Sequence, residues 1–213
     1  MWNCSRNGLS RVLSLKIQMA ILNAGDFMAK KVSLVLLVFI VGYVIGFIVH
    51  LHVYPRNEFM QFYEKIARDG GMDRWVHRRC LSDHTFTDFV RPNNDTLYSY
   101  CVVDLAAGPV MIETPAFDRY WCVQFIQENT DVFYYLSSRI NGLNRPVRMV
   151  LAPKDFSGAP KGLEVVRAPT RKVWLFCRIL VNGDRDVTAV NRLQDRLKCT
   201  RLGLPVVMRG GKV

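Results

Sequence analysis

The chain contains one long apolar stretch without a charged side chain. Between Val32 and Pro55 it reads VSLVLLVFIVGYVIGFIVHLHVYP, with no Lys, Arg, Asp or Glu. At about 1.5 Å of rise per residue, the 18 residues from Val32 to Val49 span about 27 Å, close to the hydrocarbon thickness of a bilayer. We therefore predict a transmembrane signal-anchor helix over residues 32–54, with the lipid bilayer as its partner.

The residues that flank this stretch indicate its fate and orientation. A cleaved signal peptide is the alternative, because Lys30 and Lys31 precede the stretch as a basic n-region would. However, no small-x-small cleavage site follows it. The two lysines also favour a cytoplasmic N-terminus. Residues 1–31 then form a cytoplasmic segment, with Met28 as an alternative translation start.

Helical periodicity continues beyond the apolar stretch. Four apolar residues recur there at helical spacing: Phe59, Phe62, Tyr63 and Ile66. They predict an amphipathic juxtamembrane helix within residues 55–71, which ends at Gly70-Gly71.

After residue 96 the pattern changes to short runs rich in Val, Ile, Tyr, Phe and Trp, separated by Gly, Pro and Asn-Gly turn signals. Seven such runs occur: Tyr98–Asp104, Pro109–Thr114, Tyr120–Gln127, Val132–Arg139, Val147–Leu151, Leu163–Arg167 and Lys172–Val181. Short strands at this spacing predict a mainly-β antiparallel sandwich or barrel over residues 72–202. The third and seventh runs are nearly continuous in apolar character, so we expect them at the centre of a sheet.

A C-terminal packing helix is expected to close the domain. Asp186 would cap it, and one face would carry Val187, Val190, Leu193 and Leu197. Residues 203–213 then form a basic tail.

Composition and charge narrow the function classes. The chain has 213 residues, half of them hydrophobic, and a net charge of +11. Residues 161–213 hold 12 basic and 4 acidic residues, but the basic ones are interspersed among strand and helix positions, so we expect no nucleic acid as a partner. Anionic lipid headgroups fit this basic surface better.

Familiar catalytic and cofactor motifs are missing from the sequence. It has no GxSxG elbow, no phosphate-binding glycine loop and no dinucleotide fingerprint. His77, Asp83, His84 and Asp88 lie in one segment, but the two histidines lack the spacing of a helical zinc motif and no CxxC occurs. We therefore expect neither a metal nor a cofactor.

Five cysteines fall in the predicted domain: Cys80, Cys101, Cys122, Cys177 and Cys199. Pairing is one interpretation, since an extracytoplasmic compartment is oxidising. Buried free thiols that act as small hydrophobic groups are the other.

A polar loop precedes the first strand, at Arg91–Thr96. As a turn, its Asn and Asp side chains would bond neighbouring backbone groups. As a ligand site, Arg91 would bind a carboxylate or phosphate and Asp95 would orient it, with Asn93 and Asn94 beside them. Both interpretations stay open, and no catalytic residue can be assigned.

The segment Arg91–Ser99, RPNNDTLYS, resembles the signature of the domain-of-unknown-function family numbered twelve-fifty-four. Further matches include Asp118-Arg119-Tyr120, Ala168-Pro169-Thr170 and Gln194-Asp195, so that the resemblance covers roughly residues 72–200. It implies an immunoglobulin-like β-sandwich, often followed by a second domain, the family numbered twelve-fourteen. This chain is expected to be a membrane-anchored copy without that second domain.

Together these patterns predict a single-pass protein of the bacterial inner membrane, with its N-terminus in the cytoplasm and its β-sandwich in the periplasm. An interaction or ligand-binding module is the favoured function. The alternative is an envelope enzyme, hydrolase-like, with its pocket at Arg91–Thr96. The partner of this protein would be another protein or a second copy of the chain. A second copy is suggested by Gly42 and Gly46, which form a small-xxx-small pair in the predicted helix.

Overall fold

The computed structural model describes residues 6–83, 93–158 and 160–203, with the side chains of residues 6–29 described only at Lys16, Met19 and Met28. The chain divides into two compact units, Met1–His52 and Val53–Val213. Arg91 and Pro92 of the predicted polar loop and the residues beyond 203, predicted as a basic tail, lie outside the described residues.

One helix, α1 (Arg6–Gly70), carries the apolar stretch. Its part from Lys30 to Gly70 is long and apolar enough to cross a membrane. The side chains from Val32 to Val49 are exposed in the structure. Pro55 lies inside the helix, which continues to Gly70 and is followed by Gly71 at φ +83°, a left-handed conformation that glycine adopts without strain.

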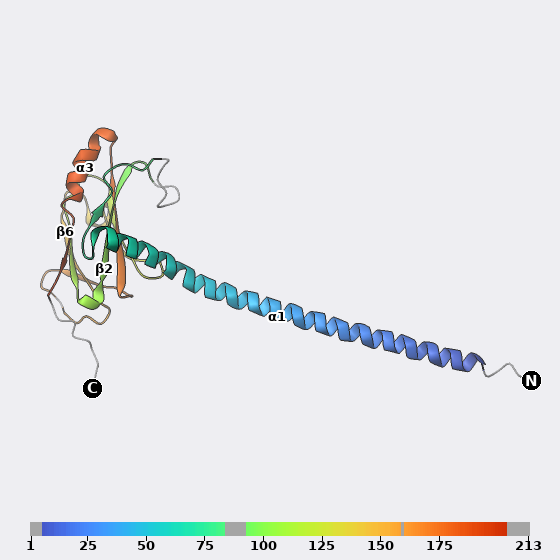
Figure 1. Ribbon diagram of the computed structural model, residues 1–213. Helices are drawn as coiled ribbons and strands as arrows, with labels where there is room; N and C mark the ends of the chain where they lie inside the picture. The colour runs from blue at the N-terminus through green and yellow to red at the C-terminus, as the bar shows by residue number, and fades with distance from the viewer. Residues whose placement is uncertain (1–5, 84–92, 159, 204–213) are drawn as a thin grey trace, which may run out of the picture. The chain divides into compact units, whose positions relative to one another are not determined.

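The described residues of the second unit form nine strands in two sheets, with bounds β1 (Val76–His77), β2 (Thr96–Asp104), β3 (Val110–Thr114), β4 (Trp121–Ile126), β5 (Val132–Ser137), β6 (Val147–Ala152), β7 (Glu164–Arg167), β8 (Lys172–Leu180) and β9 (Lys198–Arg201). The five-stranded sheet has the order β1-β2-β8-β4-β5 and the four-stranded sheet the order β7-β6-β3-β9. Short helical segments are η1 (Leu105–Ala107), α2 (Ser138–Asn141), η2 (Asp184–Asp186) and α3 (Val187–Gln194). Figure 1 shows β2 and β6 in separate layers, with α3 at one end of them. This confirms the predicted mainly-β sandwich with an N-terminal apolar helix and a C-terminal helix.

The main core lies between the two sheets. Trp121, Phe125 and Leu175 project into it from the five-stranded sheet, and Ile112 and Met149 from the other. All five side chains are fully buried.

The outer face of the five-stranded sheet is covered as well. Phe59, Tyr63 and Ile66 of α1 pack there against Val102 and Trp174. Strands β4 and β8, predicted at the centre, stand fourth and third in the sheet. Because both faces of the sheet are covered, the sequences of these strands are almost continuously apolar and do not alternate between apolar and polar residues.

Two features of the sheets differ from the prediction. Strands β6 and β7 pair in parallel, because the chain between them crosses back before the second strand begins. Strand β9 pairs with β3, in a segment directly after the residues expected in the closing helix, where the sequence pattern predicted no strand.

The closing helix is correspondingly shorter than predicted. It ends at Gln194, so Leu197 is buried in the core from outside the helix. Asp186 makes no capping hydrogen bond. Its carboxylate instead accepts hydrogen bonds from Arg119 and from the backbone N–H of Asn182, at 2.8 Å for the latter.

The five cysteines of the β-sandwich are free thiols in the structure, which agrees with the second of the two interpretations. Cys101, Cys122 and Cys177 are buried, Cys199 is half-buried and Cys80 is exposed. None of these five is in a disulfide.

Candidate functional site

A pocket of about 240 Å³ lies between the last turns of α1 and strands β1 and β2. Helix α1 contributes Phe62, Lys65, Ile66 and Asp69 to its wall. These positions follow the i, i+3, i+4, i+7 pattern, so they share one face of the helix. The opposite wall is formed by Val76, His77, Arg78 and Tyr100.

Aromatic stacking makes the apolar part of the pocket rigid. Phe62 stacks on Trp174 of β8, with ring centroids 5.3 Å apart and planes within 5°. Tyr100 stacks on Phe176 of the same strand, at 5.5 Å and with parallel planes. Two walls of the pocket are thus held in place by one central strand.

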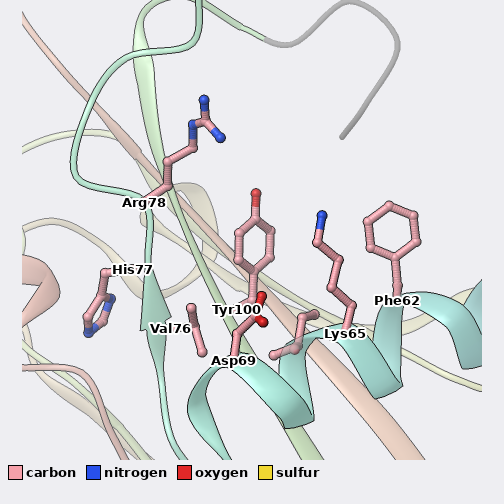
Figure 2. Close-up of a pocket in the computed structure, with 8 residues that line it drawn as sticks. Phe62, Lys65, Asp69, Val76, His77, Arg78 and Tyr100 are labelled. Carbon is pink, nitrogen blue, oxygen red and sulfur yellow. The ribbon is translucent and has the colours of Figure 1, made fainter. Parts of the chain in front are cut away.

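Charged and polar groups gather at one side of this apolar surface. Figure 2 shows the Lys65 amino group, the Arg78 guanidinium and the Tyr100 hydroxyl pointing the same way, while His77 lies apart, beyond Val76. Two cationic side chains and one carboxylate, that of Asp69, line the pocket. An arginine fork and a lysine point charge are the usual partners of a carboxylate, sulfonate or phosphate. The pocket is therefore suited to a small anion with an apolar body.

His77 belongs to a polar network behind the pocket. Its Nδ1 lies 2.9 Å from the hydroxyl oxygen of Ser99. The side-chain amide of Gln194 donates to that same oxygen at 3.0 Å, and to the backbone oxygens of Tyr98 and Arg78 at 3.0 and 3.2 Å. Burial, together with the nearby positive charge of Arg79, lowers the pKa of His77 to about 4. The imidazole is therefore neutral at pH 7 and can accept the Ser99 proton.

The His77–Ser99 contact has the composition of a nucleophile and its base but not the accessibility. Ser99 is fully buried, so no substrate reaches its oxygen. The contact instead holds the two-residue strand β1 against β2, where His77 and Ser99 are register partners. Sequence reasoning considered His77 only as a metal ligand and did not connect it with Ser99, 22 residues away.

The predicted polar loop lies elsewhere. Asn93, Asn94 and Asp95 are exposed, and none of them is among the residues that line the pocket; Arg91 falls outside the described residues. Backbone groups anchor this loop: the Asn93 N–H donates to the Tyr98 hydroxyl at 2.7 Å, and the Val181 N–H to the Asp95 carbonyl at 2.7 Å. Ligand binding by these three side chains stays a prediction.

Metal ligands do not gather in the part of the chain that the structure describes, where no three His, Cys, Asp or Glu side chains form a group that could hold an ion. Of the segment considered for a metal, His84 and Asp88 lie outside the described residues.

Two packed sheets and a covering helix define a mainly-β domain. The chain belongs to the family described as "Protein of unknown function (DUF1254)", whose model matches residues 72–201, more than half of its 213 residues. This confirms the resemblance seen in the sequence. No curated protein matches the chain.

Two of the solved structures that match this chain are from bacteria. The VPA0106 protein from Vibrio parahaemolyticus matches with a TM-score of 0.58 and 22% identity, over 77% of this chain and 41% of that one. An uncharacterised protein from Burkholderia cenocepacia matches with a TM-score of 0.42 and 16% identity, over 78% of this chain and 44% of that one. The chain thus spans less than half the length of either protein, and the first likeness supports the fold alone.

Proposed function

We propose that this chain is a single-pass protein of the bacterial inner membrane that displays its β-sandwich in the periplasm and binds a small organic anion there. The anion would have an apolar body that contacts Phe62 and Tyr100 and an acidic group that contacts Lys65 and Arg78. At about 240 Å³, the pocket is slightly smaller than those that hold drug-sized ligands.

The pocket's cationic rim above an aromatic wall is the observation that supports binding of an anion. Anchoring is supported by α1, in which the uncharged stretch precedes the turns that pack on the sheet. The last turns of that same helix also form one wall of the pocket. The residues that would bind the ligand therefore follow the anchor closely in the sequence.

Membrane attachment is tested by alkaline carbonate extraction of membranes that contain the full chain. We expect the protein to stay in the pellet, because a helix with this uncharged length is stable in lipid. Release into the supernatant would contradict the anchor.

Orientation is tested with a membrane-impermeant maleimide. Cys80 is exposed, whereas Cys101, Cys122 and Cys177 are buried. In a Cys4→Ala background, we expect Cys80 to be labelled in intact spheroplasts and the signal to fall in the matched Cys80→Ala variant. Labelling only after permeabilisation would contradict a periplasmic domain.

Ligand binding is tested with 1-naphthoate, an aromatic carboxylate, titrated calorimetrically into the full chain in a neutral detergent. Its uncharged analogue 1-naphthamide is the control ligand. We expect Arg78→Gln and Lys65→Gln each to weaken naphthoate binding about tenfold or more, since a charge-assisted hydrogen bond contributes about 1.5–3 kcal/mol. Lys154→Gln, an exposed lysine outside the pocket lining, should leave binding unchanged. Equal affinity for the acid and the amide would contradict the proposed anion site.

A further inference from the structure

Two cysteines face each other across the sandwich. Cys101 belongs to β2 of the five-stranded sheet and is fully buried in the core between the sheets. Cys199 belongs to β9 of the four-stranded sheet, pairs in register with the core residue Ile112 and packs against the same core. The Cys199 side chain is close enough to raise the pKa of the Cys101 thiol. The two cysteines thus belong to strands of opposite layers and point into the same core.

The other cysteines are placed less well for pairing. Cys122 is the register partner of Arg178, whereas Cys177 is the partner of Val123. Neighbouring positions on a strand point to opposite faces, so the side chains of Cys122 and Cys177 diverge.

Cys101 and Cys177 point into the same core, but they are diagonal neighbours, because Cys101 is opposite Leu175 and Cys177 is opposite Ser99. Diagonal positions lie about 7–8 Å apart, beyond the usual Cα separation of a disulfide.

We propose that Cys101 and Cys199 form an inter-sheet disulfide when the domain meets a disulfide oxidant such as oxidised glutathione. The half-buried Cys199 thiolate attacks the oxidant first, which forms a mixed disulfide and releases one glutathione. The Cys101 thiolate then attacks the Cys199 sulfur and releases the second glutathione. Two protein thiols are oxidised, one oxidised glutathione is reduced to two glutathione molecules, and the two thiol protons end on these products.

The order of the two steps follows from burial. Burial and the neighbouring Cys199 thiol raise the pKa of Cys101. Cys101 is therefore a poor first nucleophile, because the thiolate is the reactive form. It becomes competent once the neighbouring Cys199 carries glutathione as a leaving group. This chemistry does not depend on the proposed ligand, and a periplasmic location would supply the oxidising conditions.

The test uses the purified full chain in detergent, as a Cys80→Ser variant so that the exposed thiol cannot link two molecules. After exposure to oxidised glutathione, the protein is unfolded in acid, alkylated with N-ethylmaleimide, digested and examined by mass spectrometry. We expect one peptide pair joined through Cys101 and Cys199, a loss of two alkylated thiols per chain, and a rise in the thermal unfolding midpoint that dithiothreitol reverses.

Two further variants separate this pair from the alternatives. Cys199→Ser should abolish both the linked peptides and the rise in the midpoint, whereas Cys122→Ala should retain both. A link between Cys101 and Cys177, or glutathione left on Cys199 without any linked pair, would overturn the proposal. Because the peptide map of the parent protein is decisive by itself, the test stands even where a variant folds poorly.

Discussion

The ion pair of Arg201 with Asp73 provides the sharpest test of how the domain is held together. The Arg201 guanidinium donates to both carboxylate oxygens of Asp73, at 2.6–2.9 Å. It also donates to the backbone oxygens of Asp104, at 3.0 Å, and Gly108, at 2.5 Å. One side chain of edge strand β9 thus connects the segment after α1 with the end of β2 and the turn before β3.

The magnitude follows from the partial burial of the pair. The Arg201 and Asp73 side chains are 25% and 21% exposed. Removing one partner of a fully buried pair costs about 3–5 kcal/mol, whereas an exposed pair contributes about 0.2–1 kcal/mol. We expect Arg201→Met, which keeps the apolar stem but removes all four interactions, to lower the free energy of unfolding by about 3 kcal/mol.

A double-mutant cycle isolates the pair itself. Asp73 has φ +59°, and asparagine tolerates this left-handed conformation, so Asp73→Asn removes the charge with little backbone strain. We expect Asp73→Asn alone to cost about 2 kcal/mol, and the two changes to be coupled by about 1.5 kcal/mol.

The assay is urea unfolding of the full chain in detergent, followed by tryptophan fluorescence. Trp121 is buried between the sheets and Trp174 is buried beneath α1. Arg148→Met is the matched control, since Arg148 pairs with Glu113 but is 57% exposed, and it should cost less than 1 kcal/mol. An Arg201→Met variant no less stable than the control, or a coupling near zero, would refute the reasoning.

Three further predictions concern the region around the pocket. Because the pKa of His77 is lowered to about 4, the imidazole binds a proton more readily in the unfolded chain than in the folded one. The free energy of unfolding should therefore be unaffected by His77 above about pH 6.5 and should fall by about 1–2 kcal/mol toward pH 4, after allowance for solvent screening. Urea titrations at several pH values measure this loss, and the His77→Gln variant should lack it. Phe59→Ala should cost about 3–4 kcal/mol in the same assay, against less than about 0.5 kcal/mol for the exposed Gln61→Ala, and equal losses would exclude a packed helix. At Gly70 a Cβ would lie 2.1 Å from Cγ2 of Val76, so Gly70→Ala should lower the thermal unfolding midpoint. Adding Val76→Ala should partly restore the midpoint. An unchanged midpoint in Gly70→Ala would show that Val76 moves aside without cost.

Much of this fold is encoded in local sequence patterns. The spacing of Phe59, Tyr63 and Ile66 marks the helix face that packs on the sheet, and the unbroken apolar runs of β4 and β8 mark strands covered on both sides. These signals are readable because each depends on the periodicity of a single element.

The features that sequence reasoning missed depend on contacts between distant segments. Strand β9 alternates exposed Lys198 and Thr200 with partly buried Cys199 and Arg201, but it directly follows a helical pattern and becomes a strand by pairing with β3, more than 80 residues earlier. The pocket has the same origin: Lys65, Arg78 and Tyr100 come from three separate segments of the chain, and no local motif relates them. Sequence spacing identified instead the polar loop before β2, whose described side chains are exposed.

The helical cover on the five-stranded sheet has a practical consequence for producing this protein. The family match begins at residue 72, after the turns of α1 that bury Val102, Ile126 and Trp174. A recombinant fragment that starts at residue 72 would leave this apolar face of the five-stranded sheet exposed to solvent, and we expect such a fragment to self-associate. A fragment intended for crystallisation should therefore start between Tyr54 and Phe59, so that it lacks the apolar stretch but keeps the turns of α1 that pack on the sheet.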